Sequence, residues 1–280
     1  MNTISHKKSL KNDGKLELFF IGTGSAFAQK HNQTNFLIIK GEDHVAVDFG
    51  MSGPKALLET AGLSPTDLRI VLPTHSHSDH VGGIECLALT NRYVGMRFMG
   101  HPKLKIIINE EYQRLLWTHT LQGGLEQNES QSGGAECLGF SDFFDVIRPS
   151  WKTHQPRETW TVNIGDIKID LFRTKHIPEQ ANCWDASFVS YGLCIDDRVF
   201  YSGDTRFDAD LIDIYKDCEI MFHDVQFFPG AVHTPLADLK TLPDDIKKKM
   251  FLIHYADNYD LQDINGFGGW TKQGVSYIFD

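Results

Sequence analysis

The sequence predicts an α/β (α+β) fold in which two mixed β-sheets pack face to face, with helices on the outside. Two observations support this fold class. Short apolar runs typical of buried strands recur along the 280 residues, and amphipathic stretches typical of helices follow them. This order of strands and then helices occurs twice, without an internal repeat of fixed short period. The length suits a large core, and we expect a single domain over residues 1–280.

The first half of the chain begins with a polar leader, residues 1–14, and then alternates strands with helices. A tight glycine turn, Gly22 to Ser25, follows the first strand. A phosphate-binding loop is the alternative there, but the lysine and the helix pattern of a P-loop are absent. Ser64 is expected to cap a helix that begins at Pro65. The expected strands cover residues 16–21, 35–40, 44–48, 70–73 and 105–108, and the other expected helices cover 53–61, 84–93, 109–120 and 140–146.

An insertion over residues 109–159 separates the two halves. Its segment 122–134 is polar and rich in glycine, so we expect a mobile loop there. From Trp160 onward the pattern changes to strands again. The expected strands of the second half cover residues 160–164, 167–173, 188–195, 199–202, 219–222 and 250–253, and the expected helices cover 208–215, 236–241 and 244–249.

Composition excludes several classes of protein. The five cysteines are scattered and contain no CxxC pair, so neither a disulfide framework nor a cysteine zinc site is expected, and a reducing, cytoplasmic location fits best. No segment has the pattern of a signal peptide or the length of a membrane span. The formal net charge of −10 makes a nucleic-acid partner unfavourable, because such affinity depends on Lys and Arg. A small anionic substrate remains compatible, since bound metal ions would dominate the local charge.

The residues from His75 to His80 form the most informative motif. They place His75, His77, Asp79 and His80 within six positions, directly after an apolar run. Imidazole and carboxylate groups together suit zinc or a similar divalent ion. In an extended loop, residues two apart point the same way, so His75 and His77 can bind one ion. Asp79 and His80 would then point apart and reach a second ion. The alternative is a polar surface loop with histidines placed by chance.

Further candidate ligands follow other apolar strands. His176, Asp204 and His254 each come just after such a run, and strand ends can meet at one edge of a sheet. Alone, His176 could be a surface residue and Asp204 a turn residue. Together with the histidine motif, they would complete a dinuclear centre, with three histidines on one ion, Asp79 and two histidines on the other, and Asp204 between them.

The His75-x-His77-x-Asp79-His80 pattern resembles that of the metallo-β-lactamase superfamily, which are metal-dependent hydrolases with a four-layer αββα sandwich. The resemblance extends from residue 16 to about residue 257. It implies two divalent ions per chain, zinc by preference and manganese as an alternative. One ion would be held by His75, His77 and His176, the other by Asp79, His80 and His254, and Asp204 would bridge them. His154 is an alternative to His176, which we prefer because it lies between two strands.

Three flanking segments resemble the RNase Z and phosphodiesterase branch of that superfamily. They are the FIGTGS segment with the later HNQTN, the MFHD segment that ends at Asp224, and His233-Thr234. The resemblance implies that His233 protonates the leaving group, a task that suits imidazole near neutral pH. Asp224 would orient His233, and Asp79 would hold or deprotonate the attacking water. The alternatives are a loop histidine for His233 and a buried structural role for His223.

The second half resembles most closely the anti-Pycsar cyclic-nucleotide phosphodiesterases, which act as homodimers. This implies hydrolysis of a 3′,5′-cyclic nucleotide to the 5′-monophosphate by a hydroxide held between two metal ions. Two alternatives stay open, an RNase Z-like tRNA 3′-processing endonuclease and a metal-binding protein without catalysis. Against tRNA, the segment 122–136 contains three glutamates and no Lys or Arg. The candidates for a pocket rim are Phe227, Phe228, Trp117 and His119, although packing is the alternative for each.

Overall fold

The computed structural model describes residues 7–129, 137–181, 183–230 and 232–280. The chain divides into two compact units. The first contains residues 1–21, 35–149 and 276–280, and the second contains residues 22–34 and 150–275. Each unit holds one mixed sheet with helices, which confirms the predicted pair of sheets. The prediction of a single domain stays a prediction, as does that of a mobile loop, because residues 130–134 lie outside the described part.

The first unit is built on a seven-stranded sheet. Its strands pair antiparallel at one end, in the β2–β3 hairpin and between β1 and β15, and parallel from β3 to β6. Gly41 turns the hairpin with a positive φ of 59°, a conformation that glycine adopts without steric cost. In spatial order the strands are β15 (Ser276–Phe279), β1 (Leu16–Gly22), β2 (Asn35–Lys40), β3 (Asp43–Val47), β4 (Ile70–Leu72), β5 (Leu104–Ile107) and β6 (Phe144–Ile147).

The helices of the first unit begin at or next to the predicted residues, but several of them end at other residues than predicted. Helix α1 (Gly53–Ala61) has the predicted bounds, and the Ser64 cap opens only a 3-10 turn, η1 (Pro65–Asp67). The predicted helix over 84–93 is α3 (Ile84–Thr90), which continues as the π-helix η2 (Asn91–Met96) and then α4 (Arg97–Met99). The insertion forms α5 (Glu110–Leu116), the π-helix η3 (Trp117–Leu121), α6 (Gln122–Leu125) and α7 (Phe140–Phe143).

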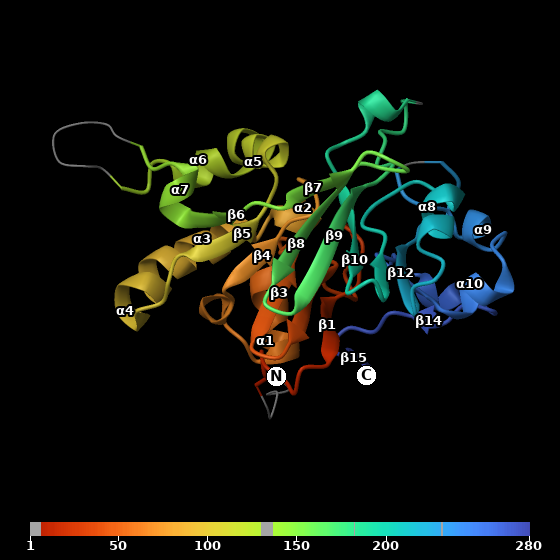
Figure 1. Cartoon of the computed structure of the whole chain (residues 1–280), viewed down its shortest axis with the longest axis horizontal. Helices are drawn as coiled ribbons and strands as arrows, with labels where there is room; N and C mark the ends of the chain where they lie inside the picture. Colours follow the sequence, from red (N-terminus) through yellow and green to blue (C-terminus); the bar gives the residue numbers. More distant parts are fainter. Residues whose placement is uncertain (1–6, 130–136, 182, 231) are drawn as a thin grey trace. The chain divides into compact units, whose positions relative to one another are not determined.

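The second unit is built on an eight-stranded sheet, antiparallel from β7 to β11 and parallel from β11 to β14. Figure 1 shows β8 and β9 as a long green hairpin. In chain order the strands are β7 (Ser150–Thr153), β8 (Thr159–Ile164), β9 (Ile167–Arg173), β10 (Tyr191–Ile195), β11 (Val199–Tyr201), β12 (Ile220–Asp224), β13 (Met250–Ile253) and β14 (Gly269–Trp270).

Helices α8 (Ala209–Ile214), α9 (Leu236–Leu239) and α10 (Asp244–Lys248) pack against the parallel part of this sheet. Leu211 and Leu239 on the helices share one buried apolar cluster with Phe200, Met221 and Leu252 on the strands. The burial of these side chains fixes strands β11 to β13 side by side. Their carboxyl ends therefore lie at one edge, where the candidate ligands follow them.

Two predicted elements have wrong bounds, and strands β7, β14 and β15 are missing from the prediction. The second half of the predicted helix 140–146 is strand β6, which pairs with β5. The strand expected from Phe188 begins only at Tyr191. Strands β7 and β14 were not predicted, because β7 is mostly exposed and β14 has two residues.

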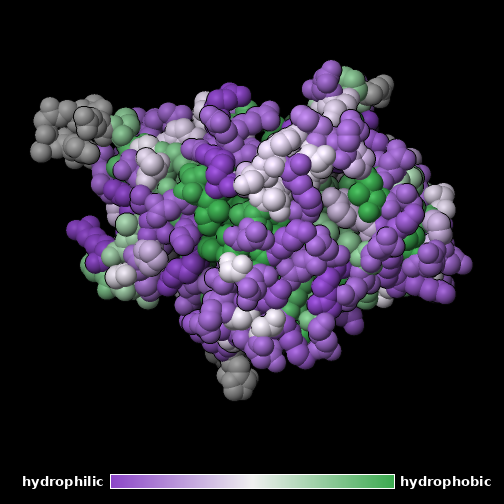
Figure 2. Space-filling view, viewed as in Figure 1, coloured by the Kyte–Doolittle hydropathy of each residue, from purple (hydrophilic) through white to green (hydrophobic). Residues whose placement is uncertain are grey.

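No helix within the described ranges has the length and apolar character that crossing a bilayer requires. Figure 2 shows one face of the molecule, on which hydrophilic side chains predominate.

His44 in β3 makes the stability of the first unit depend on pH. Burial, helped by the charge of Arg69, lowers the pKa of His44 to about 4, and His44 Nε2 accepts a hydrogen bond from the Arg69 N–H at 3.3 Å. The unfolded chain binds this proton at an ordinary pKa of 6.5. The contribution to stability is therefore complete above pH 6.5 and declines as the pH falls towards 4.

We expect His44→Gln to remove this part of the decline, because glutamine can accept the same hydrogen bond and does not titrate. The difference between variant and wild type should amount to about 2–3 kcal/mol of unfolding free energy in metal-free protein. Urea unfolding across the same pH range measures it. His154→Gln, at an exposed histidine, is the control and should keep the wild-type profile. An unchanged decline in His44→Gln would contradict the assignment.

Candidate metal centre

The histidine motif lies in the first unit, between β4 and a short helix. Residues 74–77 form a loop after the buried strand, and Asp79 and His80 lie in α2 (Ser78–Val81). His75, Asp79 and His80 are all nearly inaccessible to solvent. The alternative of a polar surface loop is therefore wrong for these three residues.

Within the motif, the candidate ligands form two close pairs, His75 with His77 and Asp79 with His80. His75 Nε2 lies 3.1 Å from His77 Nδ1, and His80 Nε2 lies 3.3 Å from Asp79 Oδ2. The expectation that Asp79 and His80 point apart is wrong, because a helical turn, and not an extended loop, carries them. Two ligand atoms bound to one tetrahedral zinc ion are about 3.3 Å apart. Each pair therefore has the spacing of two ligands on one ion.

Asp48, which directly follows β3, supports this cluster, and no motif in the sequence points to it. Its carboxylate accepts hydrogen bonds from the Thr74 N–H at 2.7 Å and the Thr74 hydroxyl at 2.9 Å, and contacts His80 Nδ1 at 2.7 Å. Burial raises the pKa of Asp48 above its ordinary value, against the opposing effect of His80 and Thr74. Because Asp48 holds Nδ1, the Nε2 atom of His80 is the one directed towards Asp79. A carboxylate behind a metal-binding imidazole is a common arrangement in zinc proteins.

We expect Asp48→Asn to weaken metal affinity by about 10- to 100-fold, because the amide cannot match the carboxylate as an acceptor for His80. Asparagine tolerates the left-handed backbone of this position, where φ is 58°, so the fold should survive. Competition with a chelating dye measures the affinity. Asp43→Asn, on the same strand and away from the motif, should leave it unchanged. Equal affinities for all three proteins would contradict the role of Asp48.

The second unit carries the remaining candidate ligands at the edge of its sheet. His176 follows β9, Asp204 follows β11 and His254 follows β13. All three are buried. Gly203 adopts a positive φ of 57°, and a Cβ there would lie 2.4 Å from the Tyr191 carbonyl oxygen, so only glycine can precede Asp204 in this turn.

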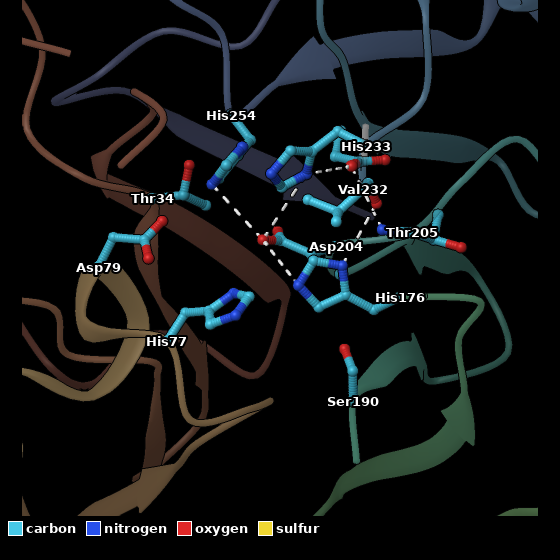
Figure 3. Close-up of polar contacts among 12 residues, drawn as sticks. Thr34, His77, Asp79, His176, Ser190, Asp204, Thr205, Val232, His233 and His254 are labelled. Carbon is cyan, nitrogen blue, oxygen red and sulfur yellow. Dashed lines mark hydrogen bonds and ion pairs between the residues drawn. The ribbon is translucent and has the colours of Figure 1, made fainter. Parts of the chain in front are cut away.

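Asp204 is surrounded by imidazoles. Its Oδ2 atom lies 3.6 Å from His254 Nε2, 3.8 Å from His233 Nδ1 and 4.0 Å from His176 Nε2 (Figure 3). These distances exceed hydrogen-bond length, and they match a carboxylate and imidazoles that share an ion between them. The other ring nitrogen of His176 contacts the Val232 carbonyl oxygen at 3.3 Å, which leaves Nε2 directed towards Asp204.

His233 and Asp224 form a separate contact in the same unit. His233 Nδ1 lies 3.0 Å from Asp224 Oδ2, and Asp224 also accepts a hydrogen bond from the Thr205 N–H at 3.2 Å. Burial acts to raise the pKa of Asp224, but His223 and His233 outweigh it, so this pKa lies below its ordinary value. Asp224 is thus a carboxylate that can hold the His233 ring in one orientation. His223 is fully buried, and its Nδ1 contacts the Asp224 carbonyl oxygen at 2.9 Å.

The donor set of each unit fits a divalent ion. Imidazole nitrogen and carboxylate oxygen are the ligands that zinc and manganese share, and a cation would offset the cost of burying Asp79 and Asp204. In the second unit, Asp204, Asp224 and His233 also offer atoms within 4.8 Å of one another. His154, the alternative to His176, is exposed, and its ring packs 4.2 Å from that of Trp151. It belongs to none of the metal-type clusters among the described residues.

Known proteins resemble this chain over most of its length. A family model described as anti-Pycsar protein Apyc1 matches residues 16–277. The chain belongs to this family. The anti-Pycsar protein Apyc1 of Paenibacillus sp. (strain J14) is 36% identical over 258 residues, which are 91% of this chain and 94% of that protein. The Apyc1 protein of Bacillus phage BSP38 is 34% identical over 269 residues, 94% of this chain and 98% of its own.

Solved structures show that the Apyc1 family member described here has the metallo-β-lactamase fold. The metallo-β-lactamase fold protein YhfI from Bacillus subtilis matches with a TM-score of 0.66 over 95% of this chain and 100% of its own, at 17% identity. The short form of human tRNase Z matches with a TM-score of 0.61 over 93% and 98%, at 13% identity. The predicted fold class is therefore confirmed. Family and buried His/Asp clusters together indicate a metal-dependent hydrolase.

Proposed function

We propose that the protein is a metal-dependent phosphodiesterase that hydrolyses a 3′,5′-cyclic nucleotide to the nucleoside 5′-monophosphate. The observation that carries the proposal is membership of the anti-Pycsar family over residues 16–277, in a chain that keeps buried His and Asp clusters in both units. The name of the relatives indicates action against cyclic-nucleotide signalling. A protein that had lost catalysis would not be expected to retain the complete set of ligand residues.

The two clusters are proposed to act as one dinuclear centre. One ion would be held by His75, His77 and His176, the other by Asp79, His80 and His254, with Asp204 as the shared ligand. This division agrees with the spacing inside the first unit, where His75 Nε2 lies 3.1 Å from His77 Nδ1 and Asp79 Oδ2 lies 3.3 Å from His80 Nε2. Two bound ions would neutralise the phosphodiester oxygens and supply a nucleophile at neutral pH. Zinc is the proposed metal, and manganese is the alternative.

The residues of the chain that move protons are proposed to be Asp79 and His233. Asp79 orients or deprotonates the attacking water. His233 donates a proton to the ribose O3′ atom as the bond from phosphorus to O3′ breaks, because an alkoxide is a poor leaving group without one. Asp224, 3.0 Å from His233, fixes the ring for this transfer. The buried carboxylate and the half-buried imidazole fit these two roles.

Transfer RNA is a less favourable substrate. The predicted acidic segment 122–136 is described to residue 129. Arg92, which lies outside the segment, pairs with Glu129 at 2.8 Å, so Glu129 is partly neutralised. Glu126 receives a hydrogen bond from Gln122, and the segment supplies no basic side chain. The net charge of −10 also opposes a polyanion.

The test is turnover of cAMP, cGMP, cCMP and cUMP by the purified protein, beside a precursor tRNA. Release of 5′-monophosphates without tRNA cleavage is the expected result. The same preparation should contain about two metal ions per chain, and a chelator should abolish turnover until metal returns. Cleavage of tRNA without turnover of any cyclic nucleotide would replace this proposal by the endonuclease alternative. No activity with a full complement of metal would support the binding-protein alternative.

Two further expectations accompany the proposal, homodimerisation from the resemblance and a cytoplasmic location from the scattered cysteines. A dimer would elute with about twice the mass of the 31.7 kDa chain. Light scattering coupled to gel filtration distinguishes it from a monomer. The exposed Cys86, Cys137 and Cys183 are free thiols, which agrees with a reducing compartment.

A further inference from the structure

A cavity of about 700 Å³ lies wholly within the second unit and begins beside two residues of the proposed centre. His233 and His254 line one part of it. The rest of its wall comes from two loops and from the chain after β13. Its size lies in the range of small-molecule sites. The residues that form the wall away from the histidines are Ser25, Ala26, Phe27, Val225, Gln226, Phe227, Phe228, Ala256, Asp257 and Asn258.

Phe27 is the most unusual residue of this wall, because 93% of its surface is exposed to solvent. It lies in a tight turn closed by a hydrogen bond from the Ala28 N–H to the Ser25 carbonyl oxygen at 3.1 Å. The backbone on either side of the turn is held. The Ser25 N–H donates to the Tyr255 carbonyl oxygen at 3.1 Å, and the Asp257 carboxylate accepts from the Gln29 N–H at 2.9 Å. A fixed turn thus presents an aromatic ring whose apolar surface is left to water.

A second loop of the wall contributes another exposed ring. Phe228 is 59% exposed, whereas its neighbour Phe227 packs against Trp270, with ring centroids 5.9 Å apart. Gln226 ties this loop together, because its N–H donates to the Thr234 carbonyl oxygen and its Nε2 donates to the Phe228 carbonyl oxygen at 2.9 Å. Gln226 is itself 5% exposed, and its Oε1 has no hydrogen-bond partner within the described part of the chain.

The chemistry of the wall distinguishes between the parts of a nucleotide. Away from His233 and His254, the described residues that line the cavity include no basic side chain, so this part of the wall has no group to pair with a phosphate. Asp257 adds negative charge there and is already engaged with the Gln29 and Lys30 backbone. Two exposed aromatic rings suit a flat, apolar ligand face instead.

We propose that this cavity binds the nucleobase of the substrate, with Phe27 and Phe228 as stacking partners. The inference rests on the proposed function, and it names the part of the second unit that recognises the substrate beyond its phosphodiester. Phe27 and Phe228 are specificity residues and take no part in the chemical step. Substitution of either residue should therefore raise KM and leave kcat nearly unchanged.

The experiment compares Phe27→Ala with wild type on two substrates. On cAMP, the variant should raise KM about 10-fold or more, with kcat within about 3-fold, because base stacking on an aromatic ring contributes on that scale. On a base-free analogue, methyl ribofuranoside 3′,5′-cyclic phosphate, wild type and variant should have equal KM values. Phe27→Trp should restore the wild-type KM on cAMP. Leu261→Ala removes an apolar side chain of the same unit that is 80% exposed and outside the cavity, and it should behave as wild type.

Two results would overturn the inference. The first is an unchanged KM for cAMP in Phe27→Ala. The second is an equal loss on the base-free analogue, which would show that the ring acts on the sugar phosphate.

A separate measurement keeps the base site and the proposed function distinct. Saturation-transfer NMR with adenosine, which carries no phosphate, should transfer signal to the base protons in wild type and lose it in Phe27→Ala. If wild type hydrolyses no cyclic nucleotide, the proposed function fails, and transfer to adenosine would still support the base site. Absence of transfer in wild type would overturn the base site even where hydrolysis is observed.

Discussion

Asp204→Asn is expected to lower kcat/KM for a cyclic nucleotide by at least about 1,000-fold, equivalent to about 4 kcal/mol of transition-state stabilisation. The carboxylate has three imidazoles within 3.6 to 4.0 Å of one oxygen, and it is buried. The amide keeps the shape and removes the negative charge that a shared ligand needs. Metal content should therefore fall below two ions per chain together with activity. Steady-state kinetics and elemental analysis of the same preparation measure both quantities.

Asp208→Asn is the matched control for this substitution. Asp208 is another buried aspartate of the second unit, but it caps α8 and pairs with Lys175 at 3.0 Å and with Arg157. The control should lose thermal stability and keep its metal and its activity. A full complement of metal with undiminished turnover in Asp204→Asn would remove Asp204 from the proposed centre.

His233→Ala should lower kcat for a cyclic nucleotide by about 100- to 10,000-fold while the metal content stays at the wild-type value. The reason is the leaving group, since the ribose O3′ atom must gain a proton as it departs. Bis(p-nitrophenyl) phosphate releases a stable phenolate that needs no proton. On that substrate the loss should shrink to a few-fold, estimated at about 5-fold or less. The ratio between the two losses is the diagnostic quantity.

His154→Ala serves as the control for His233, because His154 is an exposed histidine of the same unit that packs on Trp151. It should leave both substrates unaffected. Equal losses on the two substrates in His233→Ala would refute the role of proton donor. A simultaneous loss of metal would instead make His233 a ligand, which its distance of 3.8 Å from Asp204 permits.

The sequence predicts best those elements whose conformation depends on residues close to them in the chain. The apolar runs that form β1, β2 and β9 and the helical pattern of α1 are local features, and the sequence predicts their bounds to within one residue. The histidine motif was recognisable because ligand types crowd into six positions. The relative orientation of Asp79 and His80 could not be recognised, because the formation of a four-residue helix depends on its surroundings as much as on its own residues.

Contacts between distant residues could not be read from the sequence. Asp48 stands 32 positions before His80, in a stretch with no motif. Phe27 lies in a loop whose anchors, Tyr255 and Asp257, come more than 200 residues later. Strand β15 has four residues and becomes a strand because β1 offers its edge. Each of these features is decided by pairing across the fold, and local propensity carries no information about it.

The pairing of β1 with β15 has a consequence for the order in which the molecule can be built during synthesis. Leu16 pairs with Phe279, so the last strand of the first unit is translated after every residue of the second. Until then β1, with the apolar sequence LELFFIG, is left as an open sheet edge. Such an edge is a template for pairing with other chains. The nascent protein is therefore most exposed to aggregation while the second unit is being made, and the arrival of Ser276–Phe279 ends that period.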